Sequence, residues 1–362
     1  MPKDSTKHTN PSSKVPPNTS NQAINRFKKL QQKEILIDTI FKAIIAKDTA
    51  ALSKGITLIE SAQKNHTKKA QQLIEKCLPY ANNSIRIGIT GVPGVGKSTF
   101  IEALGNLLIE QGKKVAVLAV DPSSTISHGS ILGDKTRMES LVRSTEAFIR
   151  PSPSGKSLGG VAQKTRESII LCEAAGYDVI IIETVGVGQS ETAVHSMVDF
   201  FLLLKLAGAG DELQGIKRGI IEMADALVIN KADGDNLLRA QKAKNQFRKA
   251  LHLYPLSEND WSPEVLTCSA LEGNGINDIW GMIMKFLKIT SENGFFNKNR
   301  IQQNKFWLLQ TIEEQLKSSF YNNPEVKAIL DSKIEAVQQH KITPFAAARH
   351  LLDLNKKRKN TE

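Results

Sequence analysis

The stretch GVPGVGKS, residues 91–98, is the strongest indication of the fold in this sequence. It fits the pattern G-x-x-x-x-G-K-[ST] and lies between an apolar run, IRIGIT at 85–90, and a helical pattern that starts at Ser98. Glycines in such a loop let backbone N–H groups converge on phosphate oxygens, and the helix that follows directs its positive end at the same anion. The sequence therefore predicts a phosphate-binding loop formed by Gly91, Val92, Pro93, Gly94, Val95, Gly96, Lys97 and Ser98.

Three side chains at the end of this loop have predicted roles. Lys97 is expected to reach the β- and γ-phosphates of a nucleoside triphosphate, and Ser98 to give its hydroxyl to Mg²⁺. Thr99 is expected to bond the α-phosphate. The loop thus predicts Mg²⁺-dependent chemistry at the phosphates, with Lys97 as a catalytic candidate.

The segment NKAD at 230–233 predicts which base the bound nucleotide carries. It follows an apolar run that ends at Asn230. A carboxylate in the plane of a purine can accept from both N1–H and the 2-amino group of guanine. Adenine offers neither donor and would leave the carboxylate desolvated and unpaired. Asp233 is the candidate for this contact, whereas Asn230 would bridge loops and Lys231 would cover the purine face. The expected substrate is therefore GTP, with GDP as its product.

A second contact with guanine is expected after the run EVLTCS at 264–269. The backbone of Ser269, Ala270 and Leu271 is in position to contact the O6 atom of the base.

Carboxylates at three other positions in the chain are candidates for holding Mg²⁺ and for catalysis. Glu183 ends the run VIIIE, Asp121 follows the run VAVLAV, and Asp134 lies in the segment GDKTRM. Strand-end carboxylates in α/β folds face the ligand crevice, and one such residue usually orients the metal. For Asp121 and Asp134, capping of a helix N-terminus is the alternative that the sequence leaves open.

A glycine-rich, charged loop at 206–219 has more flexibility than a strand-to-helix turn needs. Lys217 and Arg218 in this loop are candidates for neutralising charge on the phosphates in the transition state. An ordinary polar loop is the alternative.

Apolar runs alternate with helical patterns between residues 84 and 290, which predicts an α/β P-loop fold with a mainly parallel sheet flanked by helices. The six runs expected to be strands lie at 85–90, 115–120, 179–183, 200–204, 226–230 and 264–269. We expect a disordered tail at 1–20, a helical N-terminal region at 21–83, the nucleotide-binding domain at 84–290 and a helical C-terminal region at 291–362.

Composition narrows the possible settings of the protein. No apolar run approaches the length of a membrane helix, so no membrane association is expected. The three cysteines are scattered without metal-ligand spacing, which favours a reducing, cytoplasmic setting. The net charge of +11 comes largely from the chain ends, where no aromatic residues accompany the C-terminal basic cluster, and we expect no nucleic-acid partner.

The motifs taken together resemble those of the methylmalonyl-CoA mutase-associated GTPases, a family that includes bacterial chaperones and the human cobalamin type A protein. Older annotation names some of its members arginine/ornithine transport-system kinases. The resemblance covers about residues 25–355 and rests on the segments GVPGVGKST, DPSS, GDKTRM, RPSPS, LGGVAQKTRE, ETVGVGQSE, AGAGDELQGIKRGI and NKADGD.

The resemblance implies a homodimer formed through a C-terminal arm and a partner that is an adenosylcobalamin-dependent acyl-CoA mutase. It implies that the protein gates cofactor loading of the mutase and protects or reactivates it. It also assigns Glu183 to the Walker B position, and Gln214 and Lys217 to a loop that signals the nucleotide state to the mutase. The alternative function is a nucleotide-dependent kinase of a transport system, although the chain lacks the H-R-D base loop of protein kinases.

Overall fold

The computed structural model describes residues 36–61, 63–120, 138–151, 158–184, 190–208, 218–251 and 258–359. Nothing is described of the side chains of residues 64, 158, 218 and 356–359. The tail predicted at 1–20 lies outside the described residues, as does part of the predicted N-terminal helical region.

The described residues contain a seven-stranded sheet with the order β3-β2-β4-β1-β5-β6-β7, in which every neighbouring pair is parallel. The expected parallel sheet is confirmed. The strands are β1 (Ile85–Gly91), β2 (Val115–Val120), β3 (Ala147–Arg150), β4 (Val179–Thr184), β5 (Phe200–Leu206), β6 (Ala226–Asn230) and β7 (Glu264–Thr267). The edge strand β3 was not among the predicted strands.

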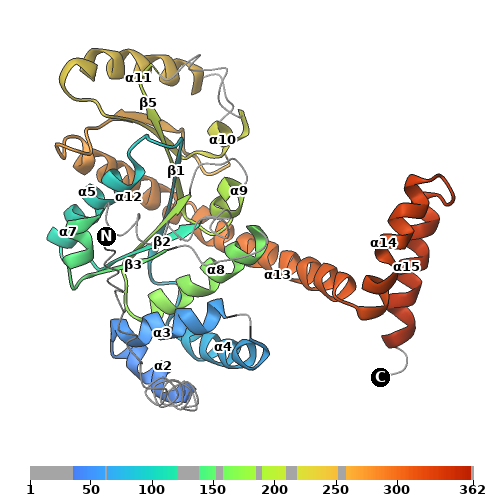
Figure 1. Ribbon diagram of the computed structural model, residues 1–362. Helices are drawn as coiled ribbons and strands as arrows, with labels where there is room; N and C mark the ends of the chain where they lie inside the picture. Colours follow the sequence, from blue (N-terminus) through green and yellow to red (C-terminus); the bar gives the residue numbers. More distant parts are fainter. Residues whose placement is uncertain are drawn as a thin grey trace, which may run out of the picture.

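Helices cover both faces of this sheet (Figure 1). Alternate residues of each strand point to opposite faces, so Val179 and Ile181 of β4 enter one core and Ile180 and Ile182 the other. The first core packs against α5 (Lys97–Glu110), α7 (Glu139–Arg143) and α12 (Ile276–Glu292). The second packs against α8 (Leu158–Ala174) and α9 (Ser190–His195), while α10 (Arg218–Met223) and α11 (Leu237–Leu251) cover β5 and β6.

The N-terminal helices α2 (Ile37–Ile45), α3 (Thr49–Glu60) and α4 (Lys64–Cys77) pack on the outer side of α8 and share its apolar core. The short 3-10 helix η1 (Leu78–Tyr80) then leads into β1. Asp48 caps α3 by accepting from the backbone N–H groups of Ala50 and Ala51. The expected helices of this region are therefore present from Ile37 onward.

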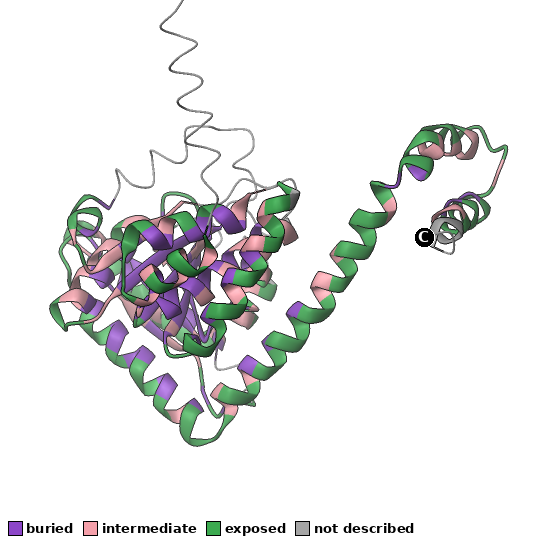
Figure 2. Ribbon diagram, turned by 90° about the horizontal axis from the view of Figure 1, so that it is seen from below, coloured by how far each residue is buried: buried purple, intermediate pink, exposed green. Residues whose placement is uncertain are grey.

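The C-terminal helices form an arm that extends away from the sheet (Figure 1). The arm consists of α13 (Phe295–Tyr321) and a hairpin of α14 (Pro324–Gln338) and α15 (Pro344–Lys359). Proline at the first position of α14 and α15 agrees with the sequence, and Asn323 caps α14 by accepting from Glu325 N–H. Most of α13 is exposed beyond its base (Figure 2).

Candidate nucleotide-binding site

The phosphate-binding loop turns at the carboxyl end of β1, the central strand of the sheet. Lys97, the first residue of α5, is 9% exposed, and its Nζ donates to the carbonyl oxygens of Gly91 at 2.8 Å and Val92 at 3.4 Å. These bonds hold the ammonium group across the loop. The first turn of a helix carries backbone N–H groups without intrahelical partners, so this end of α5 favours an anion.

Two glycines of the loop are required by close contacts. Gly91 has a φ of 154°, and a Cβ atom there would lie 2.6 Å from the carbonyl oxygen of Leu204 on β5. Gly96 has a φ of 91°, and a Cβ atom there would lie 2.7 Å from Nδ2 of Asn230. A side chain at either position would therefore displace the loop.

Asn230, at the end of β6, joins the loop to the predicted guanine segments. It is 1% exposed, and its Nδ2 donates to the carbonyl oxygen of Val95 at 2.9 Å. Its Oδ1 accepts from the backbone N–H of Ala270 at 3.1 Å and from the thiol of Cys268 at 3.4 Å. Burial raises the pKa of the Cys268 thiol to about 12, and the charge of Asp233 adds to this shift, so the thiol stays protonated as a donor.

Asp233 lies three residues further on and is oriented by Ser269, whose hydroxyl donates to Asp233 Oδ2 at 2.5 Å. Ser269 is fully buried, and its hydroxyl also accepts from Glu272 N–H at 3.2 Å. The structure thus brings Asp233 together with the segment predicted to contact guanine O6. The other predicted contacts on this side, Lys231 and Leu271, are exposed.

Between α5 and residues 270–277 lies a groove of about 500 Å³. Thr99, Ala270 and Leu271 contribute to its lining, so it adjoins the predicted base and phosphate positions.

Glu183 reaches the same edge of the sheet from β4. It pairs in register with Ile89 of β1 and Ala119 of β2, and the alternation of β4 puts it on the face covered by α5. Thr184 points to the opposite face, where its hydroxyl donates to the Thr90 hydroxyl at 2.8 Å; both are buried. This bond ties the segment after Glu183 to the strand that carries the phosphate-binding loop.

Three predicted catalytic or metal-binding residues, Asp121, Asp134 and Lys217, lie outside the described residues, as does Gln214. Their roles stay predictions. Sequence reasoning missed Thr90 and Cys268 as parts of the site. A buried polar residue in an otherwise apolar strand, such as Thr90 after IRIGI, is the signal that could have found the first.

A phosphate-binding loop held by the asparagine of an N-K-x-D segment, at the carboxyl edge of a parallel sheet, defines a P-loop GTPase. Within that class, the family model "Methylmalonyl Co-A mutase-associated GTPase MeaB" matches residues 52–325, and the chain belongs to this family. The resemblance noted in the sequence is thereby confirmed.

Individual relatives agree with this assignment. The chain is 48% identical over 304 residues to "GTPase ArgK" of Escherichia coli (strain K12), with 84% of this chain and 92% of that relative covered. It is 42% identical over 337 residues to "Methylmalonic aciduria type A homolog, mitochondrial" of Mus musculus, with 90% and 81% covered. A solved structure described as "LAO/AO transport system kinase" is 40% identical, has a TM-score of 0.72, and covers 90% of this chain and 99% of its own.

Proposed function

We propose that this GTPase is a chaperone of an adenosylcobalamin-dependent acyl-CoA mutase, methylmalonyl-CoA mutase or a related enzyme. Nucleotide state would gate the loading of the cofactor and the protection or reactivation of the mutase. Membership in a family described as associated with methylmalonyl-CoA mutase supports this proposal. The similarity to a methylmalonic aciduria type A homolog supports it as well.

One observation carries the proposal: the first turns of α13, at the base of the arm, are bonded to the segment that follows α9. Arg300 pairs with Asp199 at 2.7 Å, Gln303 Nε2 donates to Val198 O at 2.7 Å, and Trp307 Nε1 donates to Ser196 O at 3.0 Å. The helix α9 begins seven residues after Glu183, at Ser190. A change of the Glu183 segment upon loss of the γ-phosphate would therefore reach the arm through one short helix.

For the chemistry itself, we infer that Mg²⁺ is held by the Ser98 hydroxyl, by Glu183 and by phosphate oxygens, with Asp121 and Asp134 as further candidates. Within the described part of the chain, no three His, Cys, Asp or Glu side chains form a metal-binding group. Mg²⁺ usually takes few protein ligands and keeps waters and phosphates. When bound, the metal supplies neutralisation of the charge that develops on the β- and γ-oxygens. Lys97 would exchange its two carbonyl acceptors for those oxygens, and Lys217 would add a second positive charge.

We further propose that the arm joins two copies of the chain. Ile301, Leu308, Ile312 and Leu316 follow one stripe of α13 and are 69%, 61%, 46% and 56% exposed. A second copy would bury this stripe. Ile312→Glu should therefore convert a dimer to a monomer in analytical ultracentrifugation, whereas Lys317→Glu on the opposite side of α13 should not. A monomeric wild type would contradict the proposal.

A cytoplasmic setting is proposed as well. All three cysteines, Cys77, Cys172 and Cys268, are buried and unpaired, which suits a reducing compartment. No helix among the described residues is long and apolar enough to cross a membrane.

The chaperone role is tested by GTP turnover with and without a cognate adenosylcobalamin-dependent mutase. The mutase should accelerate wild-type hydrolysis, because coupling between nucleotide state and partner binding is reciprocal. Gln214→Ala should keep basal turnover within about tenfold but lose most of the acceleration. A rate of GTP hydrolysis that the mutase does not change, whether or not the mutase carries its cofactor, would contradict the chaperone role.

The same experiment with γ-labelled GTP separates the kinase alternative. The label should appear as inorganic phosphate. Label that stays on a protein acceptor would favour a kinase.

A further inference from the structure

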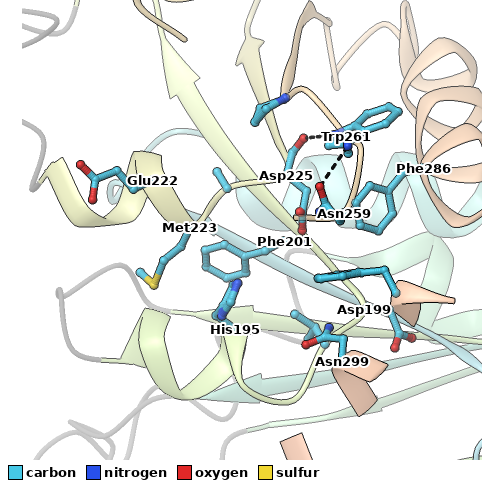
Figure 3. Close-up of a pocket in the computed structure, with 14 residues that line it drawn as sticks. His195, Asp199, Phe201, Glu222, Met223, Asp225, Asn259, Trp261, Phe286 and Asn299 are labelled. Atoms are coloured by element: carbon cyan, nitrogen blue, oxygen red, sulfur yellow. Dashed lines mark hydrogen bonds between the residues drawn. The ribbon is translucent and has the colours of Figure 1, made fainter. Parts of the chain in front are cut away.

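A second cavity, of about 290 Å³, lies at the opposite end of the sheet from the phosphate-binding loop. Val198 and Asp199 precede β5, Ala224 and Asp225 precede β6, and all four line it, so it opens at the amino ends of these strands. Figure 3 shows the residues around it. His195, Phe201, Glu222, Met223, Trp261 and Phe286 also line it.

Asp225 is held rigidly at the wall of this cavity. Its Oδ2 accepts from Phe201 N–H at 2.8 Å, its own N–H donates to Phe201 O at 2.9 Å, and its carbonyl oxygen accepts from Trp261 Nε1 at 2.7 Å. In Figure 3 its carboxyl group points toward the space between Phe201 and Phe286. Burial raises the pKa of Asp225 to about 7, so the carboxylate is partly charged at neutral pH.

The lining residues, all of them described, include no lysine or arginine. Asp199 is paired with Arg300 of α13 and belongs to the anchor of the arm. His195 lies edge-on to Phe201 with ring centroids 5.6 Å apart, and burial lowers its pKa, which favours the neutral imidazole. Glu222 lies exposed at the rim. The cavity therefore places the Asp225 carboxyl group among aromatic rings. Lys285, whose Nζ lies 5.5 Å from the centroid of the Trp261 ring, pairs with Glu264, which is not a lining residue.

We propose that this cavity binds a small organic cation, an ammonium or guanidinium group on a short apolar chain. A carboxylate attracts and orients such a head group, and the lining residues Phe201, Trp261 and Phe286 suit its apolar chain. The volume is near the lower end of ligand pockets, about 300–1,000 Å³, which restricts the occupant to a small molecule. The walls include residues of α9, α10, α12, α13 and β5, and the proposal does not depend on the chaperone role.

The test uses butylguanidinium as the probe and its neutral analogue butylurea as the matched control, titrated calorimetrically into the full chain at pH 8 in an amine-free buffer. Butylguanidinium should bind at one saturable site and butylurea should not. Asp225→Asn, which keeps an oxygen for Phe201 N–H, should weaken binding at least about tenfold. Asp331→Asn on α14, outside the cavity, should leave binding unchanged.

Two further results decide the proposal if Asp225→Asn folds poorly. Met223→Arg should place a guanidinium of the chain itself in the cavity and abolish binding of the probe. For the wild type, the affinity should rise between pH 6 and 8 as Asp225 ionises. Equal binding of butylurea, undiminished binding to both variants, or no saturable binding of butylguanidinium would overturn the proposal.

Discussion

Asn230 Nδ2 donates to the carbonyl oxygen of Val95 at 2.9 Å, so the segment predicted to recognise guanine is joined directly to the phosphate-binding loop. The same side chain accepts from the backbone N–H of Ala270. A single buried amide thus connects all three segments that are predicted to contact a guanine nucleotide.

The first prediction follows from this contact. Asn230→Ala should leave Val95 O and Ala270 N–H without these partners, each at a cost of about 1–3 kcal/mol. The affinity for GDP, measured by titration of a fluorescent analogue, should therefore fall by about 10–100-fold. Asn245→Ala, on the exposed side of α11, is the control and should bind as the wild type does. Unchanged affinity in Asn230→Ala would show that the loops are held by other contacts.

The second prediction concerns the phosphates. Lys97→Ala should abolish tight nucleotide binding, and Ser98→Ala should lose Mg²⁺-dependent hydrolysis, because the Ser98 hydroxyl would hold the metal that neutralises charge on the phosphates. Phosphate release with and without a chelator measures both effects. Lys242→Ala on α11 serves as the control for loss of a surface charge. An equal rate of wild-type GTP hydrolysis with and without the chelator would contradict the metal assignment.

The third prediction concerns the base of the arm. Arg300→Met should leave Asp199 buried without its cation and lower the free energy of unfolding by about 3–5 kcal/mol. Lys298 lies on α13 two residues before Arg300 and forms an exposed ion pair with Glu258. Lys298→Met removes this pair and should lower the free energy of unfolding by less than about 1 kcal/mol. Denaturant titration followed by circular dichroism compares the two. Similar losses for both variants would contradict the role given to Arg300.

The fourth prediction is a pH dependence. Burial raises the folded-state pKa of Asp225 to about 7, so stability from this group is greatest below its unfolded pKa and declines as pH rises to about 7. Asp225→Asn lacks this decline. The free energy of unfolding of the variant minus that of the wild type should therefore rise by up to about 1.4 kcal/mol per pH unit between about pH 4 and 7. Above about pH 7 this difference should stay constant. Asp331→Asn should show no such trend, and a parallel pH profile for Asp225→Asn would refute the shift.

Much of the fold could be predicted because six of its strands are nearly continuous runs of Val, Ile and Leu, as strands buried on both faces require. Both edge strands, β3 and β7, are four residues long. The strand β7 was predicted because it begins the longer run EVLTCS, whereas β3, with the sequence AFIR, offers only three apolar residues between Glu146 and Arg150.

The candidate site was predictable only as a set of motifs. The motifs identify Lys97, Asn230 and Asp233, but the Thr184–Thr90 bond depends on the register between β4 and β1, which no local pattern encodes. The Arg300–Asp199 pair likewise joins residues 101 positions apart. Such contacts arise from tertiary packing and could not be predicted from spacing.

The most direct test of the account is the nucleotide preference of Asp233→Asn. Hydrolysis of GTP and of xanthosine triphosphate is compared for the wild type, for Asp233→Asn and for the control Asp235→Asn, an exposed neighbour. The account predicts that Asp233→Asn loses about 10–100-fold in kcat/KM for GTP and gains activity on xanthosine triphosphate, whose ring carries a carbonyl where guanine has its amino group. Asp235→Asn should keep the preference for GTP. Undiminished GTP hydrolysis by Asp233→Asn, with no gain on xanthosine triphosphate, would contradict the account.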